Sequence, residues 1–208
     1  MELGFYRFAN KEPNKLAIVG PNEELVSRGE LLSKANKLTH ALRDLGLKKF
    51  DTVAVVLPNS VEYFVVYMAC LQAGFYLVPI NWHLAGPEIA YILEDSEAKA
   101  FIASGKNPDM EKACINAVSE INFDKKGCIT IDELEGFRHI DDFTKSMPDE
   151  NPQDRSAGQV MNYTSGTTGK PKGVKRNLVE GDPDDVLSLF AMIFSFYNIQ
   201  PEDENVHI

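Results

Sequence analysis

The segment from Met161 to Val174 is the part of the sequence whose residue types best suit ligand chemistry. Its glycines let the backbone turn tightly and approach a ligand, and its hydroxyls and free amides offer many donors within one short loop. The residues at its centre are Thr164, Ser165, Gly166, Thr167, Thr168 and Gly169. Two lysines follow, Lys170 and Lys172, where their charge can neutralise a nucleotide. The residue types therefore predict a loop that holds phosphate oxygens.

Two other interpretations of this loop can be weighed from the residues. A Walker A loop ends in Gly-Lys-Ser/Thr and leads into a helix whose N-terminus faces the phosphate. Here Pro171 follows Lys170 and a strand resumes at Gly173, so a P-loop NTPase is disfavoured. Runs of Ser, Thr and Gly are more often flexible surface turns, and isolated lysines are more often solvated. The apolar strand residues on both sides of the run argue against that interpretation.

Strand and helix patterns alternate ahead of the loop, which is typical of an α/β fold with a mostly parallel sheet flanked by helices. Apolar runs predict buried strands at 51–57, 75–80 and 100–103, and turn residues predict a hairpin over 16–27. Ser60 is expected to cap a helix that ends at Gly74. Helical spacing of apolar residues predicts a helix at 28–45, and an amphipathic pattern predicts one near 110–120. A proline favoured in a first turn predicts another helix at 86–95.

The stretch from 105 to 151 gives weaker signals. A strand is predicted near 127–131, and the residues from there to Pro152 are expected to form a polar loop that joins two subdomains. We therefore divide the chain into a first α/β subdomain, residues 1–150, and the start of a next segment, residues 151–208, that carries the phosphate loop. Strands are expected on either side of that loop, at 159–164 and at 173–175.

Several residues that often bind metals are assigned structural roles. Asp182, Asp184 and Asp185 surround a proline and precede an apolar helical pattern, so they are predicted to begin a helix rather than to bind a metal. The three cysteines are widely spaced and are expected to be reduced and buried. They are Cys70, Cys114 and Cys128. The histidines show no partner in the sequence and are expected to be structural or surface residues. They are His40, His83, His139 and His207.

Charge and hydropathy exclude two classes of partner. The chain has 31 acidic and 21 basic side chains, a net charge of −10. Such a field repels nucleic acid and anionic lipid surfaces, although amides and one or two lysines in a cleft can still hold a small anion. The first residues lack a signal-peptide pattern, and no stretch reaches the ~18 apolar residues of a membrane helix. We therefore expect no nucleic-acid partner, no transmembrane segment and a cytoplasmic protein.

The loop resembles the phosphate-binding signature of the adenylate-forming enzymes, in particular the acyl-CoA synthetases. That signature reads apolar, two variable residues, Ser/Thr/Gly, Ser/Gly, Gly, Ser/Thr, Thr, Gly, a variable residue, Pro, Lys, Gly. Residues Met161 to Gly173 fit every position. The resemblance extends over nearly the whole chain. It includes the first long helix, the strand and turn at 51–59, the strand at 73–81 and the helix at 88–96.

The resemblance implies a two-step ligase that uses ATP, Mg²⁺ and coenzyme A. A carboxylate attacks the α-phosphorus of ATP to give an acyl-adenylate and pyrophosphate, and a thiol then takes the acyl group. Lys172 would supply catalytic charge and Thr164 would help to place Mg²⁺. The residues implied to bind the ATP phosphates are Thr164, Ser165, Gly166, Thr167, Thr168, Gly169 and Lys170. The expected substrate is a fatty or other lipophilic carboxylic acid.

Other parts of the family's machinery come later in its members and are not found in these residues. They include the adenine and acyl pocket, a magnesium-binding glutamate, a ribose-binding aspartate and a carboxy-terminal lysine. We therefore expect an amino-terminal portion of a longer enzyme, inactive alone, with exposed strand edges that favour self-association. Three kinds of relative share the loop: aryl-acid ligases, peptide-synthetase adenylation domains and luciferase-like oxygenases. A non-catalytic remnant that binds nucleotide or a partner chain is the rival from another class.

Overall fold

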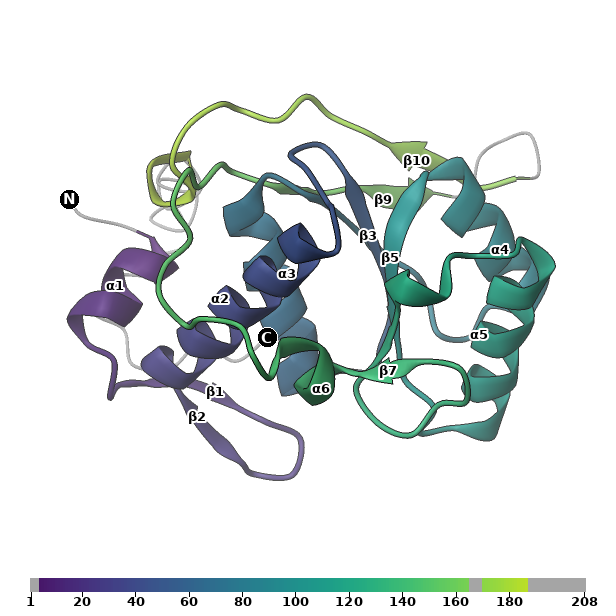
Figure 1. Ribbon diagram of the computed structural model, residues 1–208, viewed down its shortest axis with the longest axis horizontal. Helices are drawn as coiled ribbons and strands as arrows, with labels where there is room; N and C mark the ends of the chain where they lie inside the picture. Colours follow the sequence, from purple (N-terminus) through teal and green to yellow (C-terminus); the bar gives the residue numbers. More distant parts are fainter. Residues whose placement is uncertain (1–3, 165–169, 187–208) are drawn as a thin grey trace.

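The computed structural model describes residues 4–164 and 170–186. Within them a six-stranded sheet has the strand order β7-β6-β5-β3-β4-β8 (Figure 1). In chain order its strands are β3 (Thr52–Val56), β4 (Tyr76–Pro79), β5 (Ala98–Ala103), β6 (Cys128–Thr130), β7 (Arg138–His139) and β8 (Gln159–Val160). Every neighbouring pair in this sheet is parallel. The predicted α/β fold with a mostly parallel sheet is confirmed.

Helices cover both faces of the sheet, which gives three layers (Figure 1). On one face, α2 (Arg28–Asp44) and α3 (Val61–Ala73) pack around buried side chains such as Val53 and Val55. On the other, α4 (Gly86–Asp95) and α5 (Pro108–Glu120) pack around Ala54, Val56 and Phe101. Because alternate residues of β3 point to opposite faces, this central strand contributes to both cores and is buried along its whole length.

Polar residues at the helix ends fix where these helices begin and stop. The Ser60 hydroxyl accepts a 3.2 Å hydrogen bond from the Tyr63 amide at the start of α3. Gly74 ends that helix with φ of 74°, a left-handed conformation that glycine adopts without strain. Both residues have the roles predicted from the sequence. At α2, Ser27 and Glu30 form a reciprocal capping box.

The amino-terminal region contains one predicted and one unpredicted element. Strands β1 (Leu16–Val19) and β2 (Leu25–Ser27) form the expected antiparallel hairpin. Ahead of it lies α1 (Phe5–Lys11), a seven-residue helix that the sequence pattern did not reveal. Its Tyr6 side chain is fully buried and donates a 2.8 Å hydrogen bond from its hydroxyl to the Met68 carbonyl oxygen of α3. This helix is therefore part of the packed fold.

The prediction of a polar loop from 132 to 152 was wrong in part. Strand β7 and a short helix, α6 (Ile140–Thr144), occupy its centre. The His139 ring nitrogen Nδ1 accepts a 3.2 Å hydrogen bond from the Asp141 amide and so caps the helix. Ile140 and Phe143, three residues apart, are buried in the core that α2 and α3 form. One apolar pair gives too short a pattern to indicate a helix from sequence.

The single strand predicted at 159–164 divides at Met161. Strand β8 pairs with β4 in the main sheet, whereas β9 (Asn162–Thr164) pairs with β10 (Lys172–Val174) in a separate antiparallel hairpin. The Met161 side chain is buried, and its amide donates a 2.8 Å hydrogen bond to the Leu77 carbonyl oxygen of β4. Met161 therefore marks where the chain leaves the sheet. The division of the chain at residue 150 remains a proposal, with β8 joining the sheet built by the preceding residues.

Candidate functional site

The β9–β10 hairpin carries the predicted phosphate loop, and its base brings two of the predicted site residues together. Thr164 lies directly opposite Lys172 in the antiparallel register, and both residues are exposed. Residues directly opposite each other share one face of the ladder, with Cβ atoms about 4.5–5.5 Å apart. The Thr164 and Lys172 side chains therefore leave the same face of the hairpin at the base of the predicted loop. The remaining loop residues, Ser165 to Gly169, lie outside the described part of the chain.

The hairpin lies at the carboxyl edge of the parallel sheet. It follows the end of β8, and β8 lies next to β4. The chain runs from β3 to β4 on one side and then crosses to β5 on the other, so the strand order reverses between β5 and β3, further along the same edge. Ligands of open α/β sheets bind outside the carboxyl ends of the strands, which is the edge where the hairpin lies. The position of the hairpin therefore agrees with a ligand-binding role.

Helix α4 supports the hairpin through two tyrosines that the sequence did not single out. The Tyr163 hydroxyl of β9 donates a 2.7 Å hydrogen bond to Asp95 Oδ2 at the end of α4. The Tyr91 hydroxyl of α4 donates a 3.0 Å hydrogen bond to the Pro171 carbonyl oxygen, just before β10. Partial burial, and next the bond to Asp95, raise the pKa of Tyr163. The four-residue spacing of Tyr91 and Asp95 on a predicted helix was the signal available in the sequence.

The two lysines beside the loop have different surroundings. The Lys170 ammonium group lies 4.9 Å from the centre of the Tyr91 ring, a cation–π contact with α4. Lys172 makes no such ring contact within the described residues and is exposed beside Thr164. Lys172 is therefore the lysine whose charge is available at the base of the loop, and Lys170 is directed toward α4. The ligand-binding roles of both remain predictions.

Gly173 lies where two side chains approach the hairpin backbone closely. A Cβ atom added at this position would lie 2.9 Å from Tyr163 Cζ and would also collide with Met161 Cε. The first distance is shorter than real Cβ contacts allow, so a larger residue would require the Met161 and Tyr163 side chains to shift. A glycine at this point of the motif thus serves packing, beyond its expected use in the turn.

A cavity of about 800 Å³ opens beside the hairpin. Thr164 and Asn162 line it from β9, and Val174 lines it from β10. The rest of its wall includes apolar side chains from α3, from β8 and from the segment after β10: Leu71, Val160, Leu178 and Val179. Since sites for small molecules are usually concave and mostly apolar with a few polar groups, this cavity is a candidate for the ligand's place beside the loop.

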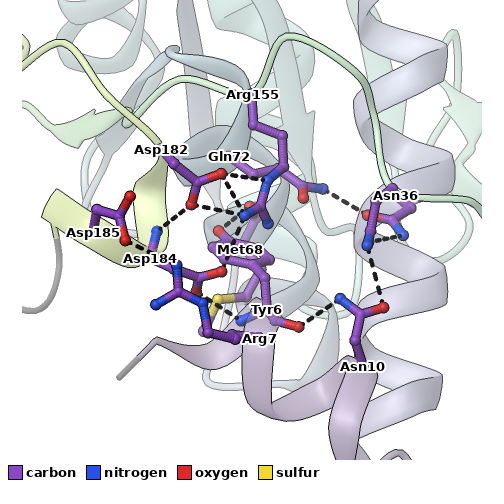
Figure 2. A network of polar contacts seen from close by, with 11 residues as sticks. Tyr6, Arg7, Asn10, Asn36, Met68, Gln72, Arg155, Asp182, Asp184 and Asp185 are labelled. Atoms are coloured by element: carbon purple, nitrogen blue, oxygen red, sulfur yellow. Dashed lines mark hydrogen bonds and ion pairs between the residues drawn. The ribbon is translucent and has the colours of Figure 1, made fainter. Parts of the chain in front are cut away.

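A cluster of charged residues ties the segment after the hairpin to the segment before it (Figure 2). Arg155 Nη2 lies 2.6 and 2.7 Å from the two carboxylate oxygens of Asp182, and 3.0 Å from Asp184 Oδ2. The predicted helix start is also present, because residues 183–186 are helical and Asp182 Oδ1 accepts a 2.9 Å bond from the Asp184 amide. Within the described residues no group of acidic, cysteine and histidine side chains could hold a metal ion. The sequence indicated the helix start but not its partner, Arg155.

The cysteines have the predicted state. Cys70, Cys114 and Cys128 are all free and buried. Burial raises the pKa of all three thiols, that of Cys128 to about 11 and that of Cys114 to about 12. At neutral pH they are therefore unreactive protonated thiols, since the thiolate is the nucleophile and the metal ligand.

The described histidines have contacts that the sequence did not reveal, and these contacts agree with the expected structural or surface roles. His40 Nε2 lies 3.1 Å from the Glu150 carbonyl oxygen, and His139 caps α6. The His83 ring lies against Trp82, with ring centres 3.5 Å apart. His207 lies outside the described residues.

Comparison with known proteins agrees with the architecture. A parallel α/β sheet with a Ser/Thr/Gly hairpin at its carboxyl edge is an arrangement suited to nucleotide binding. A family model described as AMP-binding enzyme matches residues 5–178, so the chain belongs to the AMP-binding enzyme family.

Two curated relatives and one solved structure illustrate this membership. The chain is 32% identical over 170 residues to the long-chain-fatty-acid–CoA ligase FadD13 of Mycobacterium tuberculosis, which covers 80% of the chain and 32% of the relative. It is 31% identical to the 2-succinylbenzoate–CoA ligase of Bacillus licheniformis, with 80% and 32% covered. A solved structure from Rhodopseudomonas palustris, described as a putative long-chain-fatty-acid CoA ligase, matches with a TM-score of 0.74 and 21% identity, over 96% of this chain and 48% of that one. This last likeness shows the fold.

The comparison also sets the scale of the chain. It spans about a third of the length of the two ligases. Within the described residues, no helix has both the length and the apolar character needed to cross a membrane.

Proposed function

We propose that this chain contributes the phosphate-binding hairpin of an enzyme that activates a carboxylic acid with ATP. The carboxylate attacks the α-phosphorus, forming an acyl–phosphate bond while the bond to pyrophosphate breaks. A thiol, coenzyme A by preference, then displaces AMP and takes the acyl group. The observation that carries the proposal is the pairing of Thr164 with Lys172 at the base of the hairpin, beside a cavity.

The chain's own residues suit positioning and charge neutralisation, which such a transfer needs more than a protein nucleophile. Lys172 would neutralise charge on the phosphates, and Lys170 would do so from its place over the Tyr91 ring. The remaining donors proposed for the β- and γ-phosphates are Thr164, Ser165, Gly166, Thr167, Thr168 and Gly169.

The described residues would offer Mg²⁺ few ligands of their own. The described residues offer no cluster of carboxylates for it, whereas Mg²⁺ is commonly held by one or two protein ligands together with substrate phosphates. The Thr164 hydroxyl, exposed at the base of the loop, is the group proposed to help place the ion. Bound there, Mg²⁺ would neutralise charge on the phosphate oxygens.

A fatty acid is the proposed substrate, and the FadD13 relative supports this choice. The 2-succinylbenzoate ligase, which matches with nearly the same identity, supports an aryl acid as the alternative. A peptide-synthetase adenylation domain remains a further alternative of the same chemistry. We propose a cytoplasmic location, with no nucleic-acid partner, for the protein that contains this chain.

A second candidate function is that of a non-catalytic remnant that binds a nucleotide or a partner chain. It is supported by the hairpin base and the cavity beside it, which could serve nucleotide binding without catalysis. Both candidates share the phosphate-binding hairpin, and they differ in whether turnover follows binding.

The hairpin's role is tested by titrating the 208-residue chain with MgATP at low ionic strength, in a calorimeter. Lys172→Ala should weaken binding about tenfold, or about 1.4 kcal/mol, within the range of a hydrogen bond to a charged group. Lys175→Ala is the matched control, because Lys175 lies one residue beyond β10 with its ammonium 4.8 Å from the centre of the Tyr76 ring. Equal affinities for the two variants would remove Lys172 from the site. No binding by the unaltered chain would contradict a phosphate-binding hairpin in it.

A further inference from the structure

Three segments far apart in the sequence meet at Arg155, as Figure 2 shows. Arg155 lies ahead of β8, Asp182 and Asp184 follow the hairpin, and Tyr6 belongs to α1. The Arg155 guanidinium is 5.0 Å from the centre of the Tyr6 ring, and the Tyr6 amide donates a 3.2 Å hydrogen bond to Asp184 Oδ1. We name this group of four residues, Tyr6, Arg155, Asp182 and Asp184, the Arg155 clasp.

The clasp closes the segment that carries the hairpin. Residues 156–181 contain β8, β9, the phosphate loop and β10, and Arg155 and Asp182 stand immediately outside its two ends. A backbone hydrogen bond of 3.0 Å from the Ala157 amide to the Gly181 carbonyl oxygen joins the same two ends. The whole signature motif therefore lies in a segment whose two ends are joined by the Arg155–Asp182 ion pair and by one main-chain hydrogen bond.

The ion pair of Arg155 with Asp184 is shielded from solvent more than the nearby surface pair of Arg7 with Asp185. The side chains of Arg155 and Asp184 are 15% and 2% exposed, whereas the nearby Arg7 and Asp185 pair is 39% and 68% exposed. Exposed ion pairs are weakened by water and salt, and partly buried ones are weakened much less. The guanidinium group donates from Nε to Asp182 Oδ2 at 3.1 Å and from Nη2 to Oδ1 at 2.7 Å, a bidentate geometry that fixes orientation as well as distance.

The other contacts of residues 156–181 do not replace the Arg155 clasp. Strand β8 pairs with β4 over only two residue pairs, and the loop side of the hairpin is held by Tyr91 and Tyr163 against α4. After β10 the chain is also held by the Tyr76 hydroxyl, which donates to the Arg176 carbonyl oxygen, and by packing of Leu178 against the core. Two exposed ion pairs, Lys49 with Glu180 and Arg7 with Asp185, lie in the same stretch. The clasp adds a more buried, charged contact at this end of the hairpin-bearing segment.

We propose that Arg155 is a positioning residue for the phosphate-binding hairpin, acting through its ion pair with Asp182 and Asp184. The importance of this position for ATP rests on the proposed function, whereas the clasp itself does not. Loss of the pair frees the segment after β10, and the hairpin then samples orientations in which Thr164 and Lys172 no longer face a common ligand.

The test compares three variants of the 208-residue chain. Arg155→Met removes the charge, and Arg155→Lys keeps the charge but loses the bidentate geometry. Arg43→Met is the matched control. Arg43 binds the carbonyl oxygens of Gln153 and Asp154 in the same stretch of chain without bridging to the residues after the hairpin.

The first measurement is hydrogen exchange at the β9 and β10 amides, resolved by NMR, with β3 and β5 amides as internal reference. Arg155→Met should speed exchange in the hairpin by about tenfold relative to Arg43→Met and leave the β3 and β5 amides unchanged, since local opening is confined to the released segment. Arg155→Lys should fall between the unaltered chain and Arg155→Met. Equal hairpin exchange in Arg155→Met and Arg43→Met would overturn the proposal.

Two further outcomes are also decisive. If Arg155→Met raises exchange in β3 and β5 as much as in the hairpin, and Arg155→Lys does the same, the clasp is a general stabilising contact and the positioning role is wrong. MgATP titration of the same variants links the clasp to the function: weaker binding by Arg155→Met than by Arg43→Met supports the link. If the unaltered chain binds no MgATP, the proposed function fails while the exchange result still decides the clasp.

Discussion

The Tyr163 hydroxyl donates a 2.7 Å hydrogen bond to Asp95, which joins β9 to the end of α4 across 68 positions of sequence. Tyr163→Phe should therefore loosen the hairpin from α4 with a modest loss of overall stability. We expect a loss of about 0.5–1.5 kcal/mol in the free energy of unfolding, because Asp95 is exposed and can return to water. The measurements are urea unfolding and MgATP titration, in which affinity should fall severalfold.

The control for that change is Tyr63→Phe on α3. The Tyr63 hydroxyl makes no hydrogen bond within the described part of the chain. Its removal should therefore change the free energy of unfolding and the MgATP affinity less than Tyr163→Phe does. If both variants weaken MgATP binding equally, Tyr163 does not position the hairpin.

The elements of the central sheet were readable in the sequence because their signals are local. Ser60 caps α3 and Gly74 ends it, each within a few residues of the pattern it terminates. The contacts that hold the hairpin are not local. Arg155 meets Asp182 across 27 positions, and neither residue carries a pattern that names its partner. The prediction that Asp182 begins a helix accounted for this residue from its sequence neighbours alone. It therefore gave no reason to expect the ion pair with Arg155.

The failure at Met161 has a different physical cause. The residues from 159 to 164 read as one strand because strand propensity does not report which partner each residue pairs with. Met161 is buried and still bonds to β4, while Asn162 already pairs with Val174 of β10. Likewise, α6 depends on tertiary burial of Ile140 and Phe143 and has almost no pattern of its own.

Alkaline pH should destabilise the chain through its buried thiols. The unfolded-state pKa of cysteine is about 8.5, and burial raises that of Cys128 to about 11 in the fold. A raised folded-state pKa means that the native thiol keeps a proton that the unfolded chain releases, so the stabilising effect is complete below pH ~8.5 and declines as the pH rises toward 11. The expected loss is on the order of 1–2 kcal/mol per group by pH ~9.5–10.

Cys128→Ala isolates that contribution. Its unfolding free energy should be lower than that of the unaltered chain near pH 7, from the lost packing, but it should fall less steeply between pH ~8.5 and ~9.5, below the range in which tyrosines ionise. Denaturant unfolding at a series of pH values provides the comparison. Parallel curves for the two proteins would show that Cys128 does not contribute to the alkaline loss.

The open side of β8 should drive self-association of the isolated chain. Within the described residues β8 ends the sheet and pairs with β4 alone, and Val179 beside it is 59% exposed at the cavity. Unpaired strand edges and exposed apolar patches favour contact between chains. Sedimentation velocity at increasing concentration should show species larger than a monomer.

A charged residue at that surface tests the location of the contact. Val179→Lys should shift the distribution toward monomer, whereas Leu25→Lys should not, although Leu25 is 69% exposed on the separate β1–β2 hairpin. A clean monomer of the unaltered chain at high concentration would show that the described residues already close a stable surface.

The 208-residue chain alone should make no acyl-adenylate. Adenylation requires the base, ribose and phosphates of ATP, the metal ion and the carboxylate to be held together in near-attack geometry, and such orientation can account for roughly 7–11 kcal/mol of a barrier. The described residues supply one wall of such a site: the hairpin base at Thr164 and Lys172, and the cavity beside it. A loop without an opposing wall admits water, which weakens each charge interaction.

ATP binding should therefore be weak and sensitive to salt, and exchange of labelled pyrophosphate into ATP should stay at background with fatty and aryl acids alike. A longer protein that contains this chain should show exchange. Lys172→Ala in that protein should slow exchange by an amount that corresponds to a loss of about 2–4 kcal/mol of transition-state stabilisation. Exchange by the 208-residue chain that its Lys172→Ala variant lacks would place a complete adenylation site within these residues.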